Sequence, residues 1–174
     1  MKNDVHVVLD LETMSTDKQA LVLSIGWAII KDCEIVSQGE VRPKMEAQAD
    51  RHVSFDTLRW WMDGGKAEAQ KHLASLPEWD LDVALTYLDA SVDAIKPWPK
   101  VKVWGNSPNF DCDILAGLYR SAGKEVPWKF WQERDMRTLR DVSTTARHVP
   151  KIAHTAMWDA VAEAEDLCAY LKSI

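Results

Sequence analysis

The segment Val5-His6-Val7-Val8-Leu9-Asp10-Leu11-Glu12-Thr13 is an apolar run that ends in two carboxylates. As a β-strand it places apolar side chains on both faces, which is typical of a strand buried at the centre of a sheet. Asp10 and Glu12 are two positions apart, so they point to the same face, about 6–7 Å apart at ~3.3 Å per residue. The segment therefore predicts a central strand that carries two acids on one face of its end.

Two carboxylates at the end of a buried strand repel each other and lose hydration, so their charged forms need a compensating cation. A divalent metal ion would meet this need. The alternative for this motif alone is a strand end in water, with Asp10 and Glu12 paired to lysine or arginine side chains.

The chain has 174 residues, of which 47% are hydrophobic and 28% charged, as expected for a single globular domain over residues 1–174. Its three cysteines are widely spaced and form no CxxC pair, which favours a reducing compartment over a disulfide framework or zinc site. The sequence shows no signal-peptide pattern and no apolar stretch near the ~20 residues that span a bilayer. We therefore expect a cytoplasmic protein without a membrane partner.

The net charge of −6 at pH 7 disfavours a protein that binds nucleic acid along a long groove, because such surfaces are usually basic. Residues 134–151 carry more cations than acids and form either a solvated face or a phosphate-binding track. An enzyme that holds only a chain end needs few phosphate contacts, and bound metal ions offset local acidity. The charge is therefore compatible with an end-directed nuclease.

The remaining apolar patterns and turn signals predict the other elements. Strands are expected over 20–30, 35–41, 101–104 and 128–132. Helices are expected over 54–63, 66–76, 80–95, 107–122, 135–142 and 155–174. This order predicts an α/β fold with a mixed five-stranded sheet flanked by helices.

Asp111 lies on the apolar stripe of the helix expected over 107–122, together with Ile114, Leu115 and Leu118. It is also near the helix N-terminus, where the backbone dipole favours an anion. A carboxylate on a core-facing stripe is either a hydrogen-bonding structural residue or a metal ligand, and the sequence leaves both readings open.

His154 and Asp159 are five residues apart and would diverge by about 140° on a continuous helix. They can share a site only if His154 lies in the loop before Thr155. Asp159 heads a polar series typical of an exposed helix face, so an exposed acid near a helix start is its alternative reading. This series is Asp159, Glu163, Asp166 and Tyr170. The other histidines are interpreted as packing or surface residues: His6, His52, His72 and His148.

Taken together, three motifs resemble the DEDDh 3′–5′ exonucleases, the DnaQ-like enzymes on the ribonuclease H-like fold. They are Asp10-Leu11-Glu12-Thr13, Asn109-Phe110-Asp111 and His154-x4-Asp159, in this order. The sibling DEDDy class would have tyrosine at position 155, where this chain has threonine. Two further segments resemble a bacterial and phage branch described as exoribonucleases or relatives of prophage exodeoxyribonucleases. These are Thr57-x2-Trp60-Trp61 and Arg134-Asp135-x-Arg137-Thr138.

The resemblance implies a two-metal mechanism with Mg²⁺ or Mn²⁺, hard cations that suit carboxylate oxygens. Asp10 would bridge the two ions, Glu12 and Asp159 would complete the first, and Asp111 would support the second through water. His154 would act as the general base. The expected reaction removes nucleoside 5′-monophosphates from single-stranded 3′ ends, with RNA favoured slightly over DNA. Relatives are often dimers, so the resemblance also allows a homodimer.

Substrate contacts form a separate hypothesis. Thr13 and Met14 follow the acidic strand and would contact the terminal ribose and base. Trp60 or Trp61 would stack a base, because one ring of an adjacent pair must lie off the apolar helix face. Such stacking is worth ~1–3 kcal/mol per base.

Two other functions fit parts of the pattern. An aspartate-nucleophile phosphatase also ends a buried strand in two acids, but here the second acid is Glu12 and no later lysine and Asp-Asp pair is obvious. A catalytically weak ribonuclease H-like module that only binds nucleic acid is the non-enzymatic alternative, which the intact acids and His154 oppose. The sequence lacks the P-loop and dinucleotide fingerprints.

Overall fold

The computed structural model describes residues 4–174, which form a six-stranded mixed sheet with the strand order β4-β3-β2-β1-β5-β6. Its strands are β1 (Val5–Thr13), β2 (Val22–Lys31), β3 (Glu34–Pro43), β4 (Glu78–Trp79), β5 (Val101–Gly105) and β6 (Glu133–Asp135). Strand β2 is antiparallel to both β1 and β3, whereas β4 is parallel to β3, β5 is parallel to β1 and β6 is parallel to β5. The predicted α/β class with a mixed sheet is confirmed.

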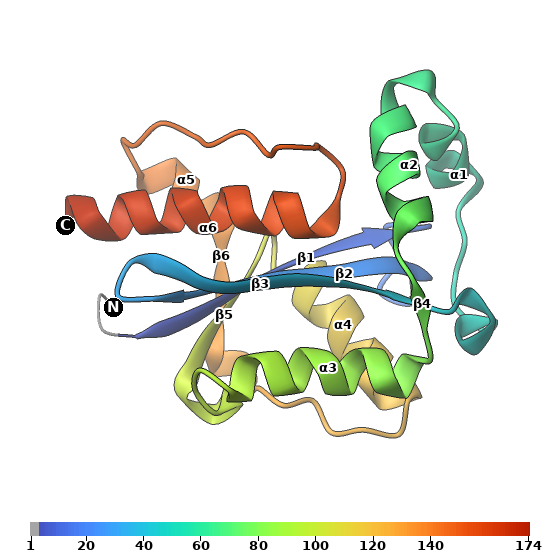
Figure 1. Cartoon of the computed structure of the whole chain (residues 1–174), viewed down its shortest axis with the longest axis horizontal. Coiled ribbons are helices and arrows are strands. Elements are labelled where there is room, and N and C mark those ends of the chain that lie inside the picture. Colours follow the sequence, from blue (N-terminus) through green and yellow to red (C-terminus); the bar gives the residue numbers. More distant parts are fainter. Residues whose placement is uncertain (1–3) are drawn as a thin grey trace.

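Helices cover both faces of this sheet (Figure 1). The α-helices are α1 (Phe55–Trp61), α2 (Ala67–Ser75), α3 (Leu81–Asp93), α4 (Asp111–Ser121), α5 (Met136–Val142) and α6 (Ala156–Ser173). Short 3-10 helices are η1 (Met45–Gln48), η2 (Gly64–Lys66), η3 (Trp98–Lys100) and η4 (Phe130–Gln132). Helices α3 and α4 lie on one face of the sheet, and α5 and α6 lie on the other. Among residues 4–174, no helix is both long and apolar enough to cross a membrane.

Strand β1 is central and buried, as its sequence predicts. Its odd-numbered apolar residues belong to the core beneath α3 and α4, and Val8 belongs to the smaller core beneath α5 and α6. Asp10 and Glu12 share the face of Val8, so both acids point toward the layer that contains α6. The alternation of side chains along one strand thus selects the face on which the acids lie.

Three expected elements differ in the structure. The sheet has a sixth strand, because Glu78 and Trp79 pair with the end of β3, and two residues are too short to show a periodic pattern. Residues 128–132 were expected to form a strand but end in η4, because the Gln132 side chain donates to the carbonyls of Trp98 and Val101. The last strand is the β6 segment that follows. Helix α4 begins at Asp111, after a turn closed on the carbonyl of residue 107.

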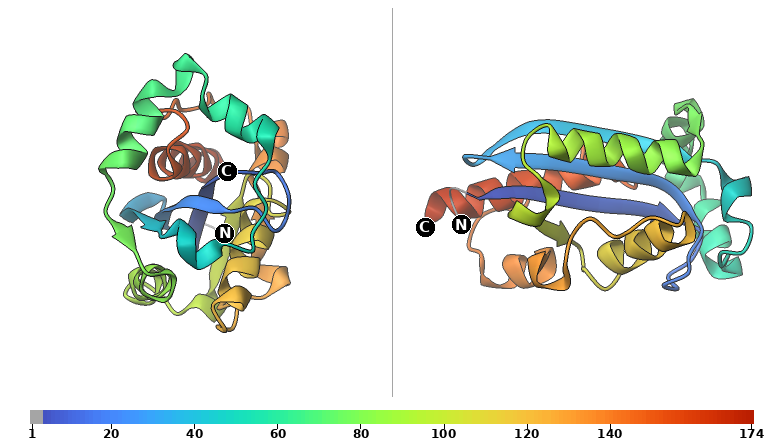
Figure 2. Two further views of the ribbon diagram at one scale, coloured as in Figure 1. Left: turned by 90° about the vertical axis from the view of Figure 1, so that its right-hand side faces the viewer. Right: turned by 90° about the horizontal axis from the view of Figure 1, so that it is seen from below.

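Helices α1 and α2 stand at the end of the sheet where β1 terminates (Figure 2). They have a small core of their own, formed with the start of β2: Leu21, Leu23, Trp61 and Ala69, with Met14 and Leu73 packed against it. Helix α1 therefore lies beside the predicted acidic residues, although it is distant from them in sequence.

A glycine allows α6 to approach the sheet. Gly26 of β2 is the cross-strand partner of Asp10, and a Cβ atom on Gly26 would lie 2.1 Å from the carbonyl carbon of Ala156. Any larger residue at this position would displace the first turn of α6, which contains Asp159. The sequence analysis did not predict this close approach.

Candidate active site

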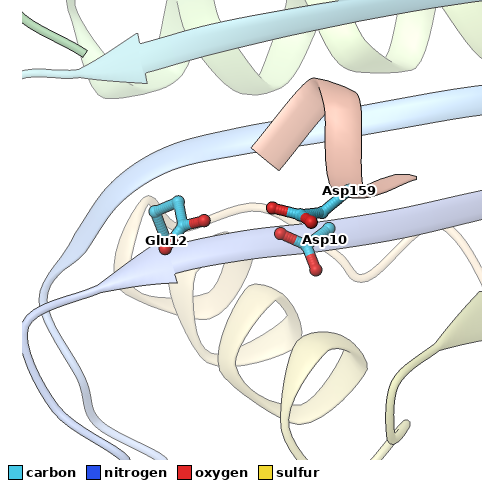
Figure 3. A group of neighbouring side chains, drawn as sticks. All are labelled: Asp10, Glu12 and Asp159. Atoms are coloured by element: carbon cyan, nitrogen blue, oxygen red, sulfur yellow. The ribbon is translucent and has the colours of Figure 1, made fainter. Parts of the chain in front are cut away.

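Three of the predicted metal ligands converge. Asp10, Glu12 and Asp159 each offer a carboxylate oxygen, and these three oxygens lie within 4.8 Å of one another (Figure 3). Asp10 and Glu12 come from β1, and Asp159 comes from the first turn of α6 above that strand. The structure thus brings together acids that are about 150 residues apart in sequence.

The start of α6 fixes the carboxylate of Asp159. The backbone N–H of Thr155 donates to Asp159 Oδ2 at 2.9 Å, which is a helix-capping contact. Thr155 itself is buried, and its hydroxyl donates to the carbonyl of Ile152 at 2.7 Å. These contacts hold Asp159 against the strand, so the alternative of a freely exposed acid does not describe it.

Asp111 is buried at the start of α4, and both of its carboxylate oxygens accept backbone hydrogen bonds. Leu11 N–H donates to Oδ1 at 3.2 Å, and Asn106 N–H donates to Oδ2 at 2.6 Å. The Leu11 contact links Asp111 directly to the segment between Asp10 and Glu12. Asp111 therefore adjoins the three-acid group but is not one of the three whose oxygens cluster.

His154 lies in the loop immediately before α6, the placement that lets it share a site with Asp159. Its backbone φ is +62°, in the left-handed region that a non-glycine residue rarely adopts, and such strain is frequent at functional sites. The Trp60 ring and the imidazole pack edge to face with ring centroids 4.9 Å apart. Helix α1 thus supports the imidazole from outside the acidic group.

The acids strongly perturb one another. Burial raises the pKa of Asp10 well above its usual value, and repulsion from Asp111 and Glu12 raises it further. Burial, repulsion from Asp159 and repulsion from Glu40 raise the pKa of Glu12 to about 8. Burial raises the pKa of Asp111 to about 7, although its backbone donors oppose the change. The negative charges are therefore crowded and poorly solvated.

A divalent cation fits this arrangement. Among residues 4–174, no lysine or arginine forms a salt bridge with Asp10, Glu12 or Asp159. The clustered donors are all carboxylate oxygens, the ligands preferred by Mg²⁺ and Mn²⁺. Their charge supplies the attraction, and their separation is small enough for shared coordination.

A cavity of about 510 Å³ adjoins the acids. Its wall includes Glu12, Thr13, Trp60, Trp61 and Phe110. Trp60 is 40% exposed, whereas Trp61 is 7% exposed and its Nε1–H donates to the Thr13 carbonyl at 3.0 Å. Of the two indole rings, Trp60 is the one available to a ligand.

The other two predicted substrate contacts have structural partners. The Thr13 hydroxyl donates to the carbonyl of Ser15 at 2.7 Å, although Thr13 still lines the cavity. Met14 packs against the small core between α1, α2 and the start of β2. Both substrate contacts stay predictions.

Sequence analysis missed two further acids near the site. Glu40 of β3 is paired with His72 of α2 at 2.7 Å, and its charge raises the pKa of Glu12. Glu163 of α6 is buried, and its charge raises the pKa of Asp10. The spacing of four between Asp159 and Glu163 was the available signal for the second acid. The polar series in which it occurs was interpreted as exposed.

The fold, the match to an exoribonuclease family model and the likeness to known exonucleases define a class, the DnaQ-like 3′–5′ exonucleases on the ribonuclease H-like fold. Residues 5–171 match the 3′-5′ exoribonuclease Rv2179c-like domain, and the chain belongs to this family. It is accordingly a 3′–5′ exonuclease, as its motifs indicated.

Named relatives agree with this assignment. An exodeoxyribonuclease of Enterobacteria phage T4 is 27% identical over an alignment of 192 positions, which covers 87% of this chain and 82% of the relative. E. coli exonuclease I, solved in complex with single-stranded DNA, matches 98% of this chain with a TM-score of 0.67 and 12% identity. Cell-death related nuclease 4 matches 98% of this chain with a TM-score of 0.52 and 15% identity. This chain spans 40% and 64% of those two structures, respectively, and the matches show the shared fold.

Proposed function

We propose that this exonuclease uses two divalent cations, Mg²⁺ or Mn²⁺, to remove nucleoside 5′-monophosphates from single-stranded 3′ ends. The observation that carries the proposal is the convergence of Asp10, Glu12 and Asp159 beside a cavity, with His154 in the adjoining loop. The family assignment favours this reaction over the phosphatase and the binding module that the sequence left open.

Each acid has a role in holding the cations. Asp10, Glu12 and Asp159 would hold one ion, and Asp10 with Asp111 would hold the second. The two occupied oxygens of Asp111 support an indirect role for this residue, through water. When bound, the ions would neutralise charge on the attacking and leaving oxygens of an in-line displacement.

His154 would act as the general base. It is exposed, and a ring nitrogen could accept the proton of an attacking water near Asp159. The edge contact with Trp60 and the left-handed backbone limit the orientations of the imidazole.

The cavity would hold the terminal nucleotide. The exposed Trp60 ring supports stacking on a base, and Thr13 lies on the same wall next to Glu12. We propose RNA as the slightly preferred substrate because the family is described as exoribonucleases, although the phage relative is an exodeoxyribonuclease. A single domain over residues 1–174, a cytoplasmic location and a homodimer stay predictions.

A gel assay tests the proposal. Single-stranded RNA and DNA oligonucleotides, labelled at the 3′ or the 5′ end, are incubated with wild type or Asp10→Ala in Mg²⁺ or Mn²⁺. We expect 5′-labelled ladders that shorten progressively, early release of the 3′ label as a mononucleotide, and no reaction with Asp10→Ala or EDTA. Internal cleavage, degradation from the 5′ end or full activity in EDTA would contradict the proposed function.

A further inference from the structure

Glu163 is a buried acid beside the proposed metal centre. It is 4% exposed and lies on α6 one turn after Asp159, on the same side of the helix. Burial raises the pKa of Glu163 to about 8, although Arg140 opposes this increase. Keeping such a carboxylate inside a protein costs stability unless its oxygens are satisfied.

The direction of α6 places Glu163 at the inner end of the acidic group. Helix α6 runs opposite to β1 (Figure 1), so the step from Asp159 to Glu163 follows the strand in the direction from Glu12 to Asp10. The electrostatic neighbours agree. Asp159 is the acid that most affects Glu12, whereas Asp111 is the acid that most affects both Asp10 and Glu163.

The two oxygens of Glu163 differ. Oε1 lies 3.4 Å from Arg140 Nη1, at the long end of a hydrogen bond. Oε2 is buried, and within residues 4–174 no donor completes a hydrogen bond to it. The Asn106 side chain acts as a weak hydrogen-bonding neighbour that favours the charged form of Glu163, although it forms no hydrogen bond of normal geometry to Oε2, and the Asn106 backbone N–H holds Asp111. Glu163 and Asp111 thus adjoin a common residue.

Arg140 does not account for the position of Glu163, because its better contacts go to a different acid. Asp166 Oδ2 lies 3.0 Å from Arg140 Nη2 and 3.1 Å from its Nε. The other oxygen of Asp166 accepts from the backbone N–H of His148 at 2.7 Å. Asp166 is therefore the satisfied partner of Arg140, whereas Glu163 has one buried oxygen without a hydrogen-bond donor among residues 4–174.

We propose that Glu163 is a fifth acidic residue of the metal centre and contributes its free Oε2 to the cation site formed by Asp10 and Asp111. The inference rests on the proposed two-cation function. Arg140 would hold Oε1 and so leave Oε2 directed at the cation site. The cation would in turn satisfy the buried oxygen that the protein leaves without a donor.

Mn²⁺ binding to the free protein tests this role without relying on activity. Wild type, Glu163→Gln and Asp166→Asn are titrated with Mn²⁺ by calorimetry and by the electron paramagnetic resonance of unbound Mn²⁺. We expect two ions on wild type and on Asp166→Asn. Glu163→Gln should keep the first ion and bind the second about 10–100-fold more weakly, the usual cost of losing a supporting group. Its activity at saturating Mn²⁺ should recover toward wild type.

Folding is a separate readout. Glu163→Gln removes a repelling charge, so in EDTA we expect its melting temperature to equal or exceed that of wild type. Glu163→Asp serves if the glutamine variant fails to fold, because it keeps a charge for Arg140 but withdraws the carboxylate by one methylene. We expect the aspartate variant to weaken the second ion as well.

The possible results separate this inference from the proposed function. Two ions of unchanged affinity on Glu163→Gln, or on Glu163→Asp if only that variant folds, would overturn the role of Glu163 while leaving the two-cation function intact. Equal weakening by Asp166→Asn would also overturn it, because the effect would then come from the Arg140 network. A wild-type protein that binds no Mn²⁺ would instead contradict the proposed function itself.

Discussion

Buried acids lie beside α6 at two places, and the protein pairs them with a cation at only one of these. Asp166 has Arg140 and the backbone of His148 as close partners. Asp10, Glu12 and Asp159 converge at the other end, and within residues 4–174 none of them has a lysine or arginine salt-bridge partner. Buried charge without a partner destabilises a fold. The presence or absence of a salt-bridge partner therefore separates an acid with a structural role from acids that bind a ligand.

Removing one acid from each of these two places should change the stability of the metal-free protein in opposite directions. This comparison has the largest expected effects. Asp10→Asn should lower exonuclease activity by about 10³-fold or more, because it removes the shared ligand of both ions. The same variant should melt at a higher temperature than wild type in EDTA, since repulsion in the site decreases. Asp166→Asn should instead lose about 3 kcal/mol of unfolding free energy, because Arg140 loses its main partner. Melting scans in EDTA measure the stability of the two variants, and single-turnover assays measure their exonuclease activity. Destabilisation of the metal-free protein by Asp10→Asn would contradict this division.

A substitution in β2 should disrupt the group of Asp10, Glu12 and Asp159 although all three acidic residues are unchanged. Gly26→Ala places a methyl group where the backbone of Ala156 lies, so α6 must shift and carry Asp159 away from β1. We expect a loss of activity of about 10²-fold and a destabilisation of about 1–3 kcal/mol.

Gly39→Ala is the matched control for that change. A Cβ atom on Gly39 would lie 2.4 Å from the Trp27 ring, away from the start of α6. This variant should therefore lose stability but keep its activity per folded molecule. Normal Mn²⁺ affinity in Gly26→Ala would show that the close approach is not needed for the site.

The metal-free protein should become less stable as the pH rises. The pKa of Glu12 is raised to about 8 and that of Asp111 to about 7, so the folded state holds protons that the unfolded state has released. The unfolding free energy in EDTA should therefore fall between about pH 5 and pH 8, lowering the melting temperature by about 5 °C. Saturating Mn²⁺ should reverse this trend, because cations bind the ionised acids. A melting temperature that rises over this range in EDTA would contradict the crowding of these acids.

Substitutions of the two tryptophans should have smaller effects, on KM at Trp60 and on melting temperature at Trp61. Trp60→Ala should raise KM for a short oligonucleotide about tenfold, because an exposed stacking surface is lost beside the cavity. Trp61→Phe should mainly lower the melting temperature, because its ring is buried and its Nε1–H holds the Thr13 carbonyl. Steady-state kinetics and melting scans separate the two effects. Unchanged KM in Trp60→Ala would exclude a substrate contact at this ring.

Patterns within single elements gave reliable predictions. The alternation along β1 correctly placed Asp10 and Glu12 on one face, and the helical stripe correctly placed Asp111 with buried leucine and isoleucine side chains. The polar series that begins at Asp159 was wrong as a sign of exposure. Glu163 and Asp166 are both 4% exposed, because Arg140 reaches both from α5 and His148, in the loop before α6, contacts Asp166. Periodicity reports the polarity of a helix face but does not identify the residues that cover it.

The sequence by itself determined the central strand, the candidate acids and, through the conjunction of their motifs, the exonuclease class. Those features depend on local periodicity and on residue identity. Only the tertiary structure decided that Gly26 admits the start of α6, that Trp60 packs on His154, and that Glu163 is buried with one oxygen lacking a donor among residues 4–174. Each of these depends on contacts between residues far apart in the chain, whose distances are set by packing of the whole sheet and its helices rather than by any local pattern.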